Sequence, residues 1–158
     1  MTLVKFMLMR PGAKMPTRGT DGSGAFDFYA PERIVLLPGH KRLVPSGIAH
    51  DLPGHLLIPT SDSPTGQISV RMQGILFDRS GLGGKKDVRI SFACLIDNDY
   101  RGEILIKFEN EGENIQTWEP GDRLCQILYV LAYSGGAEET QKLTTTTRGE
   151  GGFGSTGV

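Results

Sequence analysis

Short runs of apolar residues, many of them alternating with polar ones, follow one another along most of the chain. A period of two is typical of a strand with one buried face, whereas an amphipathic helix needs apolar residues three and four apart. Glycine and proline, with 22 and 9 copies, interrupt these runs so often that no uninterrupted stretch of helical length remains. The pattern therefore predicts an all-β protein.

Ten strands are expected where branched and aromatic residues gather between turn signals. Short strands at this spacing, separated by Pro-Gly and Asp-Gly pairs, indicate a sandwich or a barrel. Segment 60–66, which is rich in Ser, Thr, Asp, Pro and Gly, predicts the turn of a β-hairpin. The expected strands are Leu3–Met9, Phe26–Tyr29, Ile34–Leu37, Leu43–Val44, Ile48–His50, Leu56–Ile58, Ile68–Met72, Val88–Ser91, Glu103–Phe108 and Leu124–Leu131.

Composition narrows the class of protein further. A chain of 158 residues with 38% hydrophobic residues fits one domain, and its 17 basic and 18 acidic residues form no basic block that would track a nucleic acid. The sequence has no long apolar leader and no stretch that could span a bilayer, so we expect a cytoplasmic protein without a membrane partner. Cys94 and Cys125 match no metal-ligand spacing and are expected to be buried thiols.

The chain becomes polar after Leu131 and closes with a glycine-rich tail. We therefore expect a folded domain over residues 1–140 and a flexible arm over 141–158. In the arm, glycine backbone N–H groups could converge on phosphate oxygens, Arg148 could pair with a terminal phosphate, and Phe153 could stack on a base. The alternative is a linker or a solubilising tail.

Two further segments carry groups suited to phosphate chemistry. In Leu95–Glu103, Asp97 and Asp99 are two residues apart and could share a face toward a water or a hydrated cation. Arg79 and Ser80 stand before a flexible glycine and could bind a phosphate. An acidic solvated turn and a common surface turn are the respective alternatives.

Two polar residues lie within apolar strands. Asp27 needs a cationic or hydrogen-bonding partner there, so it is either structural or part of a site. Gln126 either satisfies a partner in the core or faces a ligand. The sequence leaves both choices open.

These five segments, in this order from near Gly24 to the end of the chain, resemble the five motifs of the trimeric dUTPase family. The resemblance implies a distorted, β-clip-like jelly-roll protomer in a homotrimer, with three active sites shared between subunits. It also implies hydrolysis of dUTP to dUMP and pyrophosphate, which limits uracil incorporation into DNA and supplies dUMP for dTMP synthesis.

The resemblance assigns roles residue by residue. Asp97 matches the general base that orients the water attacking the α-phosphorus, and Tyr100 the residue that packs against the deoxyribose. Asp27 matches a carboxylate that reaches the metal through water, and Mg²⁺ would bind chiefly through the triphosphate. The expected phosphate contacts are Arg79, Ser80, Gly81 and Gln126, the expected uracil hairpin includes Ser91 and Ile96, and the closing arm matches at Arg148, Phe153, Gly154, Ser155 and Thr156.

The chain also departs from the family pattern. Asp78 replaces a common proline and is expected to weaken triphosphate binding by its charge, while Ser91 replaces an asparagine of the uracil hairpin. Cys94 stands where glycine is usual, and Gly83 where alanine is usual. Residues 56–72 look like an inserted β-hairpin, which could be a contact surface for a protein partner.

Two alternatives follow from the same resemblance. A dCTP deaminase, or a bifunctional enzyme, shares the fold but needs a glutamate where this chain has Lys107, and a fixed cation cannot accept and return protons as a carboxylate does. A nucleotide-dependent regulatory protein could use the inserted hairpin as its contact surface.

Overall fold

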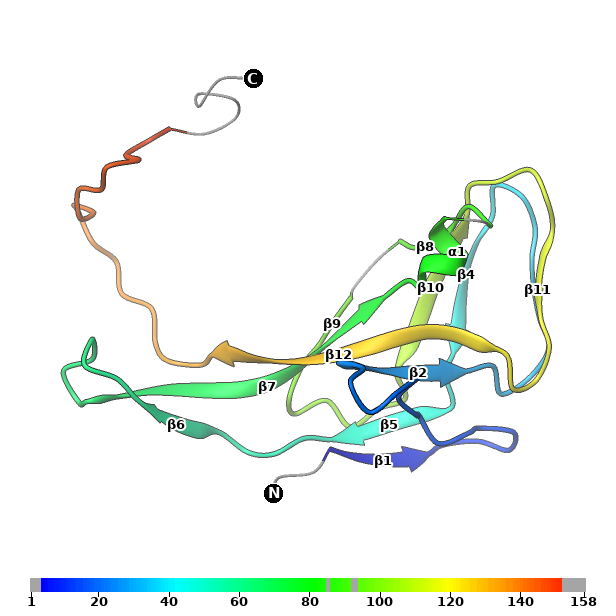
Figure 1. Cartoon of the computed structure of the whole chain (residues 1–158), viewed down its shortest axis with the longest axis horizontal. Helices are drawn as coiled ribbons and strands as arrows, with labels where there is room; N and C mark the ends of the chain where they lie inside the picture. The colour runs from blue at the N-terminus through cyan, green and yellow to red at the C-terminus, as the bar shows by residue number, and fades with distance from the viewer. Residues whose placement is uncertain (1–3, 85, 92–93, 152–158) are drawn as a thin grey trace.

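A computed structural model describes residues 4–84, 86–91 and 94–151. The described residues form twelve strands and one short helix (Figure 1). These elements are β1 (Lys5–Leu8), β2 (Ala25–Tyr29), β3 (Ile34–Leu36), β4 (Lys41–Pro45), β5 (Ile48–Asp51), β6 (Leu56–Pro59), β7 (Gln67–Phe77), α1 (Ser80–Gly83), β8 (Val88–Ile90), β9 (Leu95–Ile96), β10 (Leu105–Asn110), β11 (Gln116–Trp118) and β12 (Arg123–Tyr133).

The largest sheet is built on β7 and β12, which run side by side through the molecule (Figure 1). Its strand order is β2-β12-β7-β6, and β9 pairs with β7 further along the edge that also holds β6. All of these pairs are antiparallel. The sheet therefore connects the segments around Asp27, Arg79, Asp97 and Gln126.

Three smaller sheets complete the architecture, with orders β4-β10-β8, β1-β5 and β11-β3. Strand β10 shows the period-two alternation of a strand with one buried face. Its residues Ile106, Phe108 and Asn110 are buried, while the residues between them are more exposed. Phe108 stacks on Trp118 at 5.5 Å between ring centroids, so the sheets share one core. Among the described residues, no helix is long and apolar enough to cross a membrane.

The predicted all-β architecture is confirmed, and each of the ten expected strands has a counterpart with shifted ends. Strands β9 and β11 were not expected, and neither was helix α1, whose four residues give no helical periodicity. Expected strands of two or three residues, such as Leu43–Val44, do have counterparts, so length alone does not explain these omissions.

The predicted hairpin is present, with Thr60 N–H donating to the Gly66 carbonyl at 2.9 Å across the turn. Its boundary is different from the expected one, however, because β7 continues without a break from Gln67 to Phe77. The outer part of β7 also pairs with β12 as far as Tyr133, and Val70 is buried. The hairpin thus extends the central sheet.

The two cysteines are free thiols, as predicted, but they differ in burial. Cys125 is fully buried, whereas Cys94 is only partly buried, which corrects the expectation for this residue. Burial raises the pKa of both thiols above its ordinary value, and nearby Asp78 raises it further in each. Neither thiol is therefore an activated nucleophile.

Candidate active site

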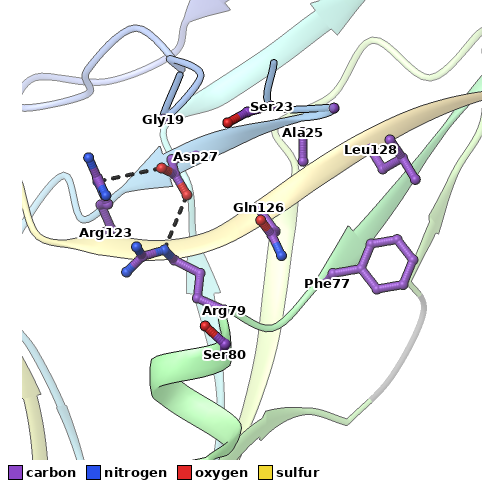
Figure 2. A pocket seen from close by; sticks show the side chains of 11 residues that line it. Gly19, Ser23, Ala25, Asp27, Phe77, Arg79, Ser80, Arg123, Gln126 and Leu128 are labelled. Carbon is purple, nitrogen blue, oxygen red and sulfur yellow. Dashed lines mark hydrogen bonds and ion pairs between the residues drawn. The ribbon is translucent and has the colours of Figure 1, made fainter. Parts of the chain in front are cut away.

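A cavity of about 530 Å³ lies where β2, β12 and the start of α1 meet. We call it the arginine cavity (Figure 2). It brings together three of the five sequence segments. Its lining residues are Gly19, Ser23, Gly24, Ala25, Asp27, Phe77, Arg79, Ser80, Arg123, Gln126 and Leu128.

Asp27 organises the charges of this cavity. It is 7% exposed, and its carboxylate lies between two guanidinium groups (Figure 2). Arg79 Nε is 3.2 Å from Oδ1, and Arg123 Nε is 3.4 Å from Oδ2. Two cations around one anion leave an excess positive charge, which favours binding of an anionic ligand.

Gln126 both satisfies a partner inside the protein and faces a cavity, the two roles that the sequence left open. Its Nε2 donates to the Asp78 carbonyl at 3.1 Å, and the residue also lines the arginine cavity. In the β2–β12 pairing, Gln126 is directly opposite Asp27, so their side chains share one face of the sheet. The hydrogen bond to Asp78 fixes the chain just before Arg79.

A neighbouring cavity of about 380 Å³ shares Arg79 and Arg123 with the first. It contains Gly81, which does not line the arginine cavity itself, and it adds the cation of Lys86. Arg79 and Arg123 therefore line both cavities, and Lys86 adds a third cation beside them.

Asp97 and Tyr100 lie elsewhere, in a third cavity of about 200 Å³ that we call the Asp97 cavity. Leu95, Ile96 and Leu105 complete its lining, and the Tyr100 hydroxyl donates to the Glu103 carbonyl at 2.9 Å. The carboxylate of Asp97 has no hydrogen-bond partner among the described residues. It is thus available to a ligand or a water.

The expectation that Asp97 and Asp99 share a face is wrong. Both residues lie in a turn that is closed by the Tyr100 N–H donating to the Asp97 carbonyl at 3.2 Å, so the chain is not extended there. Asn98 anchors the turn, since its side-chain amide donates to the carbonyls of Pro53 and Met72 at 2.9 Å each. Only the first of the two carboxylates lines the Asp97 cavity.

The arginine cavity and the Asp97 cavity have no lining residue in common. Ile96 pairs with β7, and Asp27 pairs with β12 on the opposite side of β7. Three strand spacings of about 4.8 Å separate the two residues across the sheet, roughly 14 Å in all. One chain therefore keeps its two sets of site residues apart.

Several predicted residues lie outside both cavities. Ser91 donates from its backbone and its hydroxyl to the Lys107 carbonyl, so it supports the β8–β10 edge. Arg148 lies on the exposed segment after β12, and its Nε donates to the Gly151 carbonyl at 2.8 Å. Figure 1 shows this segment turning away from the body of the molecule. Phe153, Gly154, Ser155 and Thr156 are outside the described residues.

Comparison with known proteins now identifies the family. The family model for dUTPase matches residues 54–157. A deoxyuridine 5'-triphosphate nucleotidohydrolase of Cronobacter sakazakii is 33% identical, with 98% of this chain and 95% of the relative covered. One from Acinetobacter baylyi is 34% identical over 98% of this chain and 96% of its own length. The chain belongs to the dUTPase family.

Solved dUTPase structures match the fold as well. The Staphylococcus bacteriophage 80alpha dUTPase with dUPNHPP superposes with a TM-score of 0.80 at 23% identity, and 99% of each chain is covered. The dUTPase of phage phi11 of S. aureus, described with a species-specific insert, gives a TM-score of 0.71 at 19% identity over 91% of this chain and 99% of that one. The predicted dUTPase jelly roll is therefore confirmed.

One departure from the dUTPase pattern has a structural explanation. The Asp78 carboxylate accepts a hydrogen bond from Ile90 N–H at 2.7 Å, so it joins the start of α1 to β8. Asp78 does not line the arginine cavity. This hydrogen bond directs the carboxylate to β8, and the expected weakening of triphosphate binding stays a prediction.

Arg123 is the site residue that sequence reasoning missed. It begins β12, three residues before Gln126, and a register irregularity between Arg123 and Cys125 turns it toward Asp27. A buried Asp27 requires a cationic partner, and an arginine at the end of the strand that pairs with Asp27 would meet this requirement. The sequence alone did not show that β2 and β12 are partners.

Proposed function

We propose that this protein hydrolyses dUTP to dUMP and pyrophosphate. The observation that supports this function best is the convergence of Asp27, Arg79, Ser80 and Gln126, from three dUTPase segments, on one cationic cavity. The relatives that cover nearly the whole chain are named for the same activity. The reaction would take place in the cytoplasm, where it limits uracil incorporation into DNA and supplies dUMP.

In the proposed mechanism, Asp97 accepts a proton from a water molecule that attacks the α-phosphorus, and pyrophosphate leaves. Arg79, Ser80 and Gln126 hold the phosphates, while Arg148 and the glycine-rich segment close over them and stabilise the developing negative charge. Tyr100 packs against the deoxyribose, and Phe153 covers the uracil. Closure excludes water other than the nucleophile.

Mg²⁺ is the proposed cofactor, and the donor set fits a metal that arrives on the nucleotide. Among the described residues, no group of three His, Cys, Asp or Glu side chains could hold a metal ion, and both oxygens of Asp27 already face arginines. When bound, Mg²⁺ would neutralise phosphate charge and polarise the phosphoryl oxygens. Asp27 would act on it through water. A structural Mg(II) ion is described in a mutant dUTPase of phage phi11 of S. aureus.

We further propose that the active protein is a homotrimer with sites shared between subunits. The separation of the arginine cavity from the Asp97 cavity supports this, because the proposed mechanism needs both sets of residues around one triphosphate. Exposed apolar side chains beside Asp97, at Leu95 (58%) and Leu105 (41%), would be covered by a neighbouring subunit. The segment carrying Arg148 would likewise reach a site on another chain.

A subunit-mixing experiment tests the shared site. Asp97→Asn and a chain ending at Thr147 are each expected to be inactive as homotrimers, and the two are then co-expressed with different tags. In mixed trimers, a truncated chain supplies Asp97 while an Asp97→Asn chain supplies the arm, so activity should return. Mixed trimers without any activity, or a monomer mass by light scattering, would contradict the model.

Pyrophosphate release measured with dUTP, dCTP, dTTP and UTP tests the substrate. We expect dUTP to be strongly preferred, with no deamination of dCTP, because Lys107 stands at the position where the related deaminases need a carboxylate. Formation of dUTP from dCTP would establish the deaminase alternative instead, and formation of dUMP the bifunctional one.

A regulatory protein on the same fold is the second candidate. The β6–β7 hairpin extends the central sheet away from the core and exposes Leu57 (56%), and the end of β12 beside it exposes Leu131 (50%) and Tyr133 (66%). Phage dUTPases, among them that of Staphylococcus bacteriophage 80alpha, are described as controlling the transfer of virulence genes. A pure regulator of this kind would bind dUTP without releasing pyrophosphate, so the same assay separates the two candidates.

A further inference from the structure

We propose that His50 is a positioning residue for this reaction. It holds the backbone of Asp97 through the Asp97 carbonyl and thereby sets the direction of the Asp97 carboxylate. The inference rests on the proposed role of Asp97 as general base. His50 lies outside the five dUTPase segments and lines neither the arginine cavity nor the Asp97 cavity.

Both ring nitrogens of His50 are engaged inside the protein. The residue lies on β5 and is only 2% exposed. Its Nε2 is 3.3 Å from the Asp97 carbonyl oxygen, and its Nδ1 is 3.0 Å from the Tyr129 hydroxyl. The rings of His50 and Tyr129 also pack together, with centroids 5.7 Å apart. His50 therefore connects the turn of Asp97 to the central strand β12.

The chemistry of the partners assigns the protons. A carbonyl oxygen can only accept, so Nε2 must carry the hydrogen that it donates to Asp97. Burial lowers the pKa of His50, which keeps the ring neutral and makes Nδ1 an acceptor. Burial also raises the pKa of Tyr129, so its hydroxyl keeps a proton to donate. The Asp97 carbonyl thus selects the tautomer, and the Tyr129 hydroxyl donates to Nδ1 in that tautomer.

The bond from His50 acts on the Asp97 backbone itself, beside the anchoring of the turn by Asn98 through the Pro53 and Met72 carbonyls. Strand β9 has only two residues, and Asp97 follows its end directly. The carbonyl of Asp97 accepts from the Tyr100 N–H within the turn, but that bond moves with the turn and does not fix it to the body. By contrast, His50 is on a strand paired to β1 over four residues, and Tyr129 is in the middle of β12. The hydrogen bond from His50 ties the turn to these paired strands.

Charged groups surround this contact without replacing it. Asp51, next to His50, pairs with Arg101 at 2.9 Å and with Lys5 at 3.5 Å. The positive charge of Arg101 further lowers the pKa of His50, whereas Asp51 raises it. The side chains of these ion pairs are between 48% and 77% exposed, so they hold the turn less firmly than the buried imidazole does.

The test compares His50→Gln with His50→Met. Both side chains are unbranched and similar in length, but only glutamine can donate to the Asp97 carbonyl. We expect His50→Met to lower kcat for dUTP by about 10- to 100-fold with KM changed less than about threefold, because small misplacement of a catalytic group has effects of this size. His50→Gln should recover most of the loss. His55→Leu, at an exposed histidine of the same region, should leave kcat unchanged.

The double variant His50→Met/Tyr129→Phe separates positioning from stability. Removing both polar partners avoids an unpaired buried hydroxyl, so this variant should fold even where His50→Met alone does not. Its kcat should stay low at a melting temperature near that of the wild type. A kcat near wild type in the double variant, or equal kcat in the Gln and Met variants, would overturn the proposal. Wild-type turnover by Asp97→Asn would instead reject Asp97 as the base, a separate failure.

Discussion

Arg79 and Arg148 are both predicted to bind one triphosphate, yet the chain holds them in opposite ways. Arg79 is anchored by a carboxylate that is 7% exposed and by the chain segment that Gln126 fixes. Arg148 bonds to a carbonyl three residues away on an exposed segment. The first guanidinium is placed by the fold, whereas the second contacts only its own segment among the described residues. This difference supports the proposal of a preformed phosphate cavity and of an arm that closes over it afterwards.

The largest effect is expected from ending the chain at Thr147. This truncation removes Arg148 and the glycine-rich segment, and loss of charge stabilisation of this kind typically lowers kcat by about 10²- to 10³-fold. The melting temperature should not change, since none of the described residues that the truncation removes, 148–151, is buried. Steady-state kinetics and thermal melts check both parts. A truncated protein that turns over dUTP like the full chain would show that the arm is only a tail.

The same substitution at Arg79 and at Arg148 tests most directly whether the fold holds only the first of these arginines. Arg79→Met should lower kcat/KM and also destabilise the protein by about 1 to 2 kcal/mol, because one partner of the buried Asp27 is lost. Arg148→Met should lower kcat/KM without affecting stability. Calorimetry on the two variants distinguishes them, and equal melting temperatures would mean that the Asp27 ion pairs do not stabilise the cavity.

The same contrast explains what the sequence could predict. Apolar runs between glycine and proline turn signals predicted the all-β fold, and the polar turn residues predicted the hairpin around residues 60–66. The grouping of Asp27, Arg79, Ser80 and Gln126 followed from the family resemblance, and the pairing of β2 with β12 provides its physical cause. That pairing depends on contacts between distant segments, which local patterns do not encode.

Three features were beyond local reasoning for specific reasons. Arg123 reaches Asp27 through an irregularity of register in β12, and His50 reaches Asp97 from a strand 47 positions away in the sequence. Asp78 looked like a repulsive charge near phosphate, but its partner is the backbone of Ile90. In each case the sequence shows the type of side chain but not the direction in which the side chain points.

Acid should affect the body of the protein and not the arm. Hydrogen bonds from Arg10 lower the pKa of Glu103 from its ordinary 4.5, so the stability from this pair is present above about pH 4.5 and is lost as the pH falls through the folded value. Burial lowers the pKa of His50 from its ordinary 6.5, so below pH 6.5 the unfolded chain binds the proton more readily and stability falls.

The contribution of His50 to this pH dependence can be isolated by measuring the melting temperatures of wild type and His50→Gln between pH 7 and pH 5.5. Over this range the melting temperature of the wild type should fall a few degrees further than that of His50→Gln, because only the wild type carries the buried imidazole. Asp51, Arg101 and Tyr129 face this ring and remain in both proteins. The chain ending at Thr147 should give the wild-type profile. Identical profiles for wild type and His50→Gln would mean that His50 is not the group that titrates.

The smallest effect is expected at the tip of the β6–β7 hairpin. Replacing residues 60–66 with Asn-Gly joins Pro59 to Gln67, which already face each other in register, through a favoured two-residue turn. Exposed loop tips tolerate such changes, so folding and dUTP turnover should stay within about twofold of wild type. Deleting all of 56–72 is different, because it removes the Met72 carbonyl that anchors Asn98 next to Asp97 and the strand that pairs with the end of β12. That deletion should lower both the melting temperature and kcat. If the full deletion instead behaves like the short one, the hairpin is separable from the sheet, and the anchoring of the Asp97 turn does not depend on it.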